Sequence, residues 1–159
     1  MKLTRRTLLA GASACLAMPV LASPPVADMI VVFKSSRRLV LYSNGRPIRD
    51  YSIGLGWAPT GDKSFEGDGR TPEGSYYINR RNPNSNFHLS LGISYPDSNQ
   101  VAVATAEGRN PGGEIFIHGG QGKHRQRGDW TAGCIAVSDR EIEEIWRMVP
   151  NGALVVIQP

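Results

Sequence analysis

The sequence predicts a mostly β domain of mixed sheets with one helix near the C-terminus. Short runs of β-branched and aromatic residues recur along the chain, and clusters of Gly, Pro, Asn and Asp separate them. Only the segment 138–152 combines helical spacing of apolar residues with start and stop signals. Many short strands and a single helix favour a sheet-based core over a helical bundle.

The expected strands share apolar β-formers bounded by turn residues. They are residues 30–33, 39–42, 76–78, 101–105, 115–118, 134–137 and 153–158. Asn44-Gly45 indicates a hairpin that leads into a further strand around Ile48. Pro72 and Gly74 indicate a turn. The segments 57–69 and 82–99 are expected to be loop-rich, and long loops on a sheet scaffold often carry function.

The single expected helix has a recognisable start and stop. Ser138 and Glu141 stand at capping-box spacing. Its apolar face would be formed by Ile142, Ile145, Trp146 and Val149. Pro150 and Gly152 then end it.

The N-terminus has the composition of an export signal. Lys2, Arg5 and Arg6 precede an apolar run over residues 8–22. A membrane-spanning helix needs about 20 apolar residues, so this run is too short and predicts no stable anchor after cleavage. Arg5-Arg6 resembles a twin-arginine signal, although ordinary secretion stays open. We expect residues 1–22 to be the signal peptide, and the protein to act in the periplasm or cell envelope.

Residues 23–159 are expected to form one domain. The chain holds 18 Lys and Arg against 14 Asp and Glu. Three of the basic residues lie in the signal, which leaves 15 basic against 14 acidic residues. This near balance gives no indication of nucleic-acid binding, which would need clustered positive charge.

Cys134 is the single cysteine outside the signal, so it cannot form an intrachain disulfide. It is either a buried small residue or a reactive thiol. His118 ends an apolar run and would be held by a strand, whereas His124 lies in a polar loop. Because a general base must be oriented, His118 is the predicted partner. The thiolate is the reactive form of cysteine, and a nearby imidazolium can lower the pKa of a thiol.

Two short motifs resemble the signature of the L,D-transpeptidase catalytic domain, the YkuD-like family. They are His118-Gly119 and Thr131-Ala132-Gly133-Cys134, whose cysteine lies 16 residues after the histidine. The segments 70–78 and 82–96 also resemble family segments, and the likeness extends over residues 29–159. It implies a β-sandwich or barrel-like catalytic fold. Ala136 departs from the pattern, since many members have arginine at this position.

The resemblance implies a thioester mechanism on peptidoglycan stem peptides. Cys134 would attack the stem and release D-alanine, with His118 as general base and acid. The carbonyl of Gly119 would orient the imidazole, and the N–H groups of Gly133 and Cys134 would form the oxyanion hole. An amine acceptor would then resolve the thioester, without a metal or organic cofactor.

Four residues are weaker candidates for substrate contact: Thr131, Trp130, Arg125 and Tyr95. The basic loop containing Lys123, Arg125 and Arg127 would steer acidic stems, or is simply a solvated face. Trp130 and Tyr95 are equally compatible with packing roles.

Three alternatives remain open at this point. Water could resolve the same thioester, which would make the protein a peptidoglycan carboxypeptidase or amidase. A zinc site could be built from His118, His124 and Cys134, although their spacing matches no short zinc motif. A catalytically silent cell-wall binding domain is the third.

The signal assignment makes a direct prediction about the exported protein. Its N-terminus should be Ser23, because Ala22 and Val20 suit a small-residue cleavage site. N-terminal sequencing of the exported form checks this. Retention of residues 1–22 on folded, exported protein would contradict it.

Overall fold

The computed structural model describes residues 25–122 and 127–159. Its elements, in chain order, are β1 (Met29–Phe33), β2 (Arg38–Ser43), β3 (Arg46–Ser52), β4 (Gly74–Ser85), β5 (His88–Ile93), α1 (Ser98–Ala106), β6 (Phe116–His118), β7 (Ile135–Ala136), α2 (Asp139–Met148) and β8 (Leu154–Gln158). The predicted signal peptide lies outside the described residues. Within those residues, no helix is long and apolar enough to cross a membrane.

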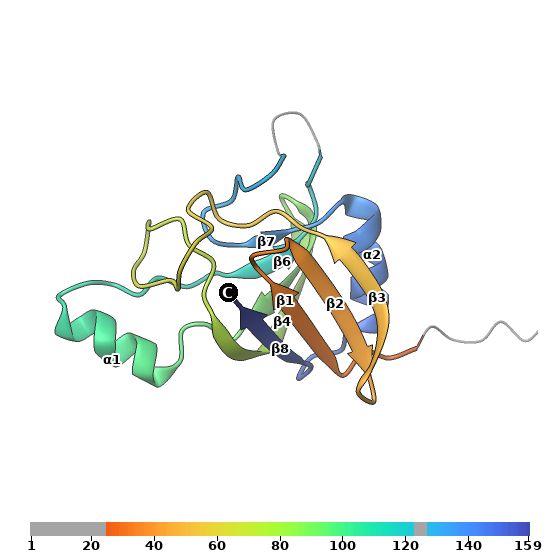
Figure 1. The fold of residues 1–159 in the computed structure, drawn as a ribbon, viewed down its shortest axis with the longest axis horizontal. Coiled ribbons are helices and arrows are strands. Elements are labelled where there is room, and N and C mark those ends of the chain that lie inside the picture. The colour runs from red at the N-terminus through yellow and green to blue at the C-terminus, as the bar shows by residue number, and fades with distance from the viewer. Residues whose placement is uncertain (1–24, 123–126) are drawn as a thin grey trace, which may run out of the picture.

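The described strands form one mixed sheet in the order β3-β2-β1-β8-β4-β5-β6-β7 (Figure 1). The β1/β8 and β6/β7 pairs are parallel, and the other neighbours are antiparallel. Just beyond β3, Gly54 exchanges two backbone hydrogen bonds of 2.8 Å with Ala136 of β7. The two ends of the sheet therefore meet, which confirms the barrel-like, mostly β prediction.

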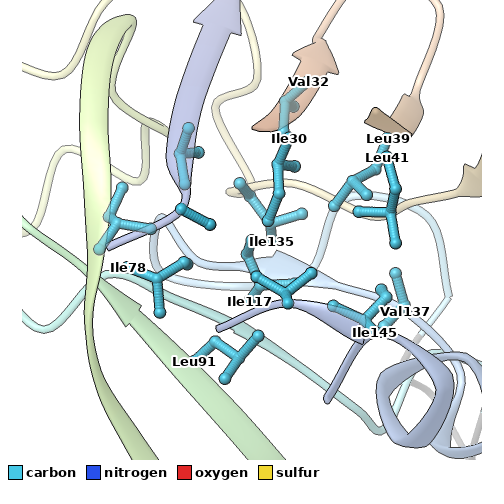
Figure 2. Close-up of a cluster of buried hydrophobic side chains, with 14 of the residues drawn as sticks. Ile30, Val32, Leu39, Leu41, Ile78, Leu91, Ile117, Ile135, Val137 and Ile145 are labelled. Atoms are coloured by element: carbon cyan, nitrogen blue, oxygen red, sulfur yellow. The ribbon is translucent and has the colours of Figure 1, made fainter. Parts of the chain in front are cut away.

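The core lies inside this curled sheet. Figure 2 shows Ile30, Leu41 and Ile78 from one part of the sheet converging on Ile117 and Ile135 from the other. Alternation along the strands decides which side chains enter the core, because successive residues point to opposite faces. Ile117 is fully buried there, whereas its neighbours Phe116 and His118 point to the opposite face.

The predicted C-terminal helix is present as α2. Ser138 accepts from the Glu141 N–H, and the Glu141 carboxylate accepts from the Ser138 N–H, which completes the capping box. Ile142, Ile145 and Met148 are buried in the core. Arg81 of β4 further ties down the end of this helix by donating to the carbonyls of Trp146 and Val149.

The sequence misses a second helix, α1. Residues 101–105, for which it predicts a strand, are helical. Asp97 caps the helix by accepting from the Gln100 N–H, and the Gln100 side-chain oxygen accepts from the Asp97 N–H. The alternation of Val101 and Val103 imitates a strand, but both side chains are exposed, and Ala104 is the buried residue. Local capping therefore outweighs the β-branched residues.

The loop prediction is right for one long segment and wrong for the other. Residues 57–69 contain no strand or helix. Residues 82–99 instead contain the end of β4, all of β5 and the start of α1. Their Asn and Ser residues suggest a loop because this hairpin presents a polar face away from the core.

Lys34, at the end of β1, is a buried cation that holds the turn before β4. Its ammonium donates to the carbonyls of Gly61 (2.6 Å) and Thr71 (2.9 Å) and to Glu73 Oε1 (2.8 Å). Its side chain is 2% exposed. All three ammonium donors are therefore satisfied by this one turn region.

Replacement of Lys34 by Ala should lower the free energy of unfolding by about 3 kcal/mol, because two carbonyls and a carboxylate lose their shared donor. Urea unfolding measures the loss. Arg38→Ala is the matched control, since it breaks an exposed ion pair with Asp50 and should change stability little. Equal effects of the two substitutions would contradict the structural role of Lys34.

Candidate active site

The parallel pairing of β6 and β7 brings the two motifs together. Ile117 pairs with Ile135 and His118 pairs with Ala136. Cys134 immediately precedes β7 and therefore stands beside Phe116. His118 and Cys134 both line a cleft of about 340 Å³. The remaining wall of the cleft comes mainly from Asn82, Asn84, Ser85, Asn86, Phe87, Ser90, Glu114 and Phe116.

The His118 ring is held in one orientation and one tautomer. Its Nδ1 lies 2.6 Å from the carbonyl oxygen of Gly119. Because a carbonyl only accepts, Nδ1 carries the proton and Nε2 is left as the basic nitrogen. Phe87 stacks on the ring at 4.5 Å between centroids, and Trp130 approaches edge-on at 5.7 Å. His118 is therefore 3% exposed.

Gly119 is also required for the close packing behind the histidine. A Cβ at this position would lie 2.7 Å from the carbonyl oxygen of Phe87 and 2.8 Å from Asp139 Oδ1. The same Asp139 oxygen accepts from the Gly120 N–H at 2.9 Å. The first residue of α2 thus fixes the turn that follows the histidine.

The resting thiol and imidazole are both held neutral. Burial raises the pKa of the Cys134 thiol, and a hydrogen bond from the Phe116 N–H opposes this only in part. Burial lowers the pKa of His118, which the Gly119 contact partly offsets. The thiol donates to the carbonyl of Glu114 at 3.5 Å instead of to His118. In this resting geometry the pKa of the thiol is therefore raised, which is the opposite of what a nearby imidazolium would cause.

Thr131 organises the backbone of the cysteine loop. Its Oγ1 accepts from the Gly133 N–H at 3.1 Å and donates to the Cys134 carbonyl at 2.7 Å. The Gly133 N–H is thus already engaged, which argues against its predicted oxyanion role. The Cys134 N–H has no acceptor among the described residues and keeps that role in our proposal.

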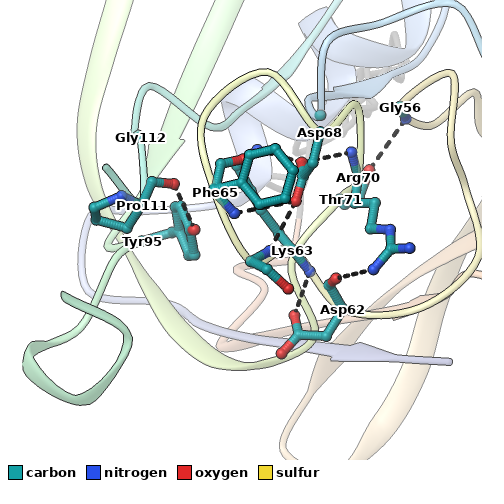
Figure 3. Close-up of polar contacts among 12 residues, drawn as sticks. Gly56, Asp62, Lys63, Phe65, Asp68, Arg70, Thr71, Tyr95, Pro111 and Gly112 are labelled. Atoms are coloured by element: carbon teal, nitrogen blue, oxygen red, sulfur yellow. Dashed lines mark hydrogen bonds and ion pairs between the residues drawn. The ribbon is translucent and has the colours of Figure 1, made fainter. Parts of the chain in front are cut away.

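Gly133 has a second reason to be glycine. Its φ is +134°, and a Cβ would lie 2.7 Å from the carbonyl oxygen of Arg70. The neighbouring Thr71 hydroxyl accepts from the Gly56 N–H at 3.1 Å, as Figure 3 shows. The turn held by Lys34 therefore forms the support behind the cysteine loop.

The predicted substrate contacts fare unequally. Trp130 packs on His118 and Phe87, with its Nε1–H donating to Gln121 at 2.5 Å. Tyr95 is buried away from this cleft, and its hydroxyl donates to the Pro111 carbonyl at 2.8 Å. Thr131 is engaged within its own loop. Arg125 lies outside the described residues, as do Lys123 and His124, while Arg127 is exposed.

A second hollow, of about 630 Å³, meets the first at Cys134 and Glu114, which line both. Lys63, Glu66 and Ala132 form part of its wall. The Lys63 ammonium donates to Asp68 Oδ1 at 2.8 Å and to the Phe65 carbonyl at 3.1 Å (Figure 3).

Asp68 gathers the loop around this hollow. Besides Lys63, it accepts from the N–H groups of Ser64, Phe65 and Arg70. Burial alone would raise the pKa of Asp68, but these hydrogen bonds together hold it below its ordinary value. The carboxylate is therefore charged and fully committed to the loop.

Several site residues are invisible to sequence reasoning. Glu114 belongs to no motif, and the resemblance of segment 82–96 gives Phe87 and Ser90 no role; the fold brings all three to the cleft. The signal that points to Phe87 and Ser90 is the resemblance of the polar segment 82–96 to the family, which does not by itself place them in the site. No group of three or more potential metal ligands occurs among the described residues. The zinc alternative also needs His124, which lies outside them.

Comparison with known proteins identifies the family. The model of the L,D-transpeptidase catalytic domain (YkuD) matches residues 27–157. The chain belongs to this family. YafK of Escherichia coli (strain K12) is 32% identical over 143 residues. This alignment covers 82% of the chain and 50% of YafK.

Solved structures share the fold. Pgp2 of Campylobacter jejuni, described as a helical cell shape determining protein, is 25% identical with a TM-score of 0.64, over 83% of this chain and 47% of Pgp2. An L,D-transpeptidase of Mycobacterium smegmatis is 13% identical with a TM-score of 0.58, over 84% of this chain and 59% of the other. This L,D-transpeptidase domain spans about half the length of YafK and Pgp2.

The neutral resting pair predicts an unusual pH dependence. Alkylation of Cys134 by iodoacetamide should rise with a midpoint above the ordinary thiol pKa of about 8.5. Unprotonated His118 should persist below its ordinary pKa of about 6.5, so the acid limb of kcat/KM should lie below that pH. Alkylation quenched at set times and followed by mass spectrometry measures the pH dependence of the Cys134 reaction rate. A plateau already present near pH 6, lost in His118→Ala, would show a preformed thiolate–imidazolium pair.

Proposed function

We propose that this chain is a cysteine-dependent L,D-transpeptidase that acts on peptidoglycan stem peptides through a thioester at Cys134. The observation that carries the proposal is the pairing, in one cleft, of a thiol with an imidazole whose Nδ1 is fixed by Gly119. Nε2 is left as the base, as general acid–base catalysis requires. Family membership supports the same reaction class.

The first half-reaction transfers the stem to sulfur. The thiol leaves the Glu114 carbonyl and turns to His118, whose Nε2 takes its proton as sulfur attacks the diaminoacyl carbonyl carbon. The Cys134 N–H stabilises the resulting oxyanion. The carbon–nitrogen bond to D-alanine then breaks, and Nε2 returns the proton to the leaving amine.

The second half-reaction transfers the stem from sulfur to an amine. The acceptor nitrogen attacks the thioester carbonyl, its proton passes to His118, and the cysteine sulfur recovers a proton when the carbon–sulfur bond breaks. Two hollows that meet at Cys134 support this step, because one can hold the acyl group while the other admits the acceptor. Neither half-reaction needs a metal or organic cofactor.

The proposed substrate also defines where the protein works. Peptidoglycan lies outside the cytoplasmic membrane, and the predicted signal at residues 1–22 would carry the chain there. We place the reaction in the periplasm or cell envelope. Pgp2 is named for helical cell shape, and remodelling of stem peptides is the route by which we propose that this chain contributes to cell shape.

Turnover of a stem tetrapeptide tests the assignment. Cys134→Ala should abolish D-alanine release, because no other thiol lies in the domain. His118→Ala should slow it by about 10²–10⁴-fold, the usual loss for a general acid–base group. His124→Ala is the matched control and should change it little. Equal losses in the two histidine variants would overturn the choice of His118.

The same assay separates transfer from hydrolysis. Wild-type protein receives the tetrapeptide with and without a saturating amine acceptor, and mass spectrometry compares cross-linked product with free tripeptide stem. We expect cross-linked product to dominate, since an acyl group held in a cleft is shielded from water. Predominant tripeptide at saturating acceptor would establish the carboxypeptidase or amidase alternative.

A further inference from the structure

Arg80 lies in the same row of the sheet as the proposed nucleophile. Arg80 of β4 pairs with Gly92 of β5, and Gly92 pairs with Phe116 of β6. Continuing the β6/β7 register by one residue places Cys134 beside Phe116. Neighbouring strands are about 4.8 Å apart, so the row leads directly from Arg80 across the sheet to the thiol.

A β-bulge turns Arg80 toward this face. The register of β4 and β5 shifts between Ile78 and Arg80, so that Asn79 is the extra residue. In a register without the bulge, Asn79 and not Arg80 would stand opposite Gly92. Bulges commonly re-aim a side chain beside an active site. Here the bulge places an arginine on the face that carries Phe116 and His118.

The side chain of Arg80 passes over Gly92 and stacks on the Phe116 ring. A Cβ at Gly92 would lie 2.7 Å from Arg80 Cγ and 2.8 Å from its Nε, so glycine is needed for the arginine to cross β5. Its guanidinium carbon then sits 4.6 Å from the centre of the Phe116 ring. This stacking directs the charge toward the Cys134 end of the row.

The present partner of Arg80 is easily displaced. Its guanidinium lies 2.8 Å from Glu114 Oε1, and the two side chains are 45% and 75% exposed. Exposed pairs of this kind contribute little to stability. Lys63, the described cation that lines the second hollow, is different, because it and Asp68 are 3% and 5% exposed. Breaking that buried pair would leave an uncompensated charge, so Lys63 is not available to a ligand.

We propose, on the basis of the proposed function, that Arg80 binds a carboxylate of the donor stem. This carboxylate would replace Glu114 as the ion-pair partner of Arg80. Arginine pairs well with carboxylates because its planar guanidinium donates two parallel hydrogen bonds. The terminal D-alanine carboxylate lies about one residue length, 3.8 Å, beyond the scissile carbonyl. The side-chain carboxylate of the diaminoacyl residue is the other source. Arg80 is thus a specificity-determining residue, and Glu114 is its resting counter-charge.

Steady-state kinetics on stem tetrapeptide test this exchange. Arg80→Gln should raise KM by about ten- to a hundredfold, as loss of a charge-assisted hydrogen-bonding partner does, with a smaller change in kcat. Arg80→Lys should retain part of the affinity, and Glu114→Gln should lower KM by removing the competitor. Arg49→Gln is the matched control, since Arg49 is also 45% exposed and ion-paired, on β3.

Amidated substrates identify the carboxylate. The effect of Arg80→Gln should vanish for the stem whose recognised carboxylate is amidated, either at the terminal D-alanine or at the diaminoacyl side chain, and persist for the other. An unchanged KM in Arg80→Gln with active wild-type protein would overturn the proposal for Arg80 alone. Inactive wild-type protein would overturn the proposed function and this inference together.

Charged and neutral alkylating agents supply a readout that needs no peptidoglycan. The ratio of the Cys134 alkylation rates with iodoacetate and iodoacetamide cancels changes in thiolate fraction. At low ionic strength Arg80→Gln should lower this ratio by about three- to fivefold, because one positive charge near the thiol is lost. Glu114→Gln should raise it, and Arg49→Gln should leave it unchanged. A ratio insensitive to Arg80 would show that its charge does not reach the thiol, which contradicts the proposal.

Discussion

The parallel pairing of β6 with β7 is the constraint on which the candidate site depends. It sets His118 beside Ala136 and leaves Cys134 at the entry to β7. Parallel neighbours cannot be joined by a tight turn and need a connection of a dozen or more residues. The 16-residue offset between His118 and Cys134 follows from this requirement. The loop between them also carries Trp130, which returns to pack against the histidine.

Backbone groups, more than side chains, shape the immediate surroundings of the two reactive residues. The Gly119 carbonyl selects the histidine tautomer, and the Glu114 carbonyl holds the resting thiol. Close approach of Gly119 and Gly133 to neighbouring carbonyl oxygens leaves no room for larger residues. Such a site is pre-organised by the fold.

The charged side chains around the site are of two kinds: buried lysines that hold loops in place, and an exposed ion pair whose partners can separate. Lys34 and Lys63 are buried and hold loops behind the cysteine segment, so their hydrogen bonds serve position. Arg80 and Glu114 are exposed and pair with each other, and Glu114 lines the cleft. The β4/β5 hairpin, which forms part of the cleft wall, is tied to α2 by a 2.8 Å contact between His88 and Glu143.

Local signals in the sequence were sufficient for part of this protein. The capping box and apolar spacing determined α2, and the Asn44-Gly45 hairpin determined the turn between β2 and β3. The placement of His118 at the end of an apolar run favoured it over His124 as the partner of Cys134. This choice stays a prediction. Each of these depends on residues close together in the chain, so pattern alone carries the information.

Tertiary structure decided what depends on distant segments. It converted most of 82–99 into paired structure, because strand pairing outweighed composition. It raised the thiol pKa through burial and aligned Arg80 with Cys134. Burial, register and the direction of a donor all arise from contacts between residues far apart in sequence, and no local pattern encodes them.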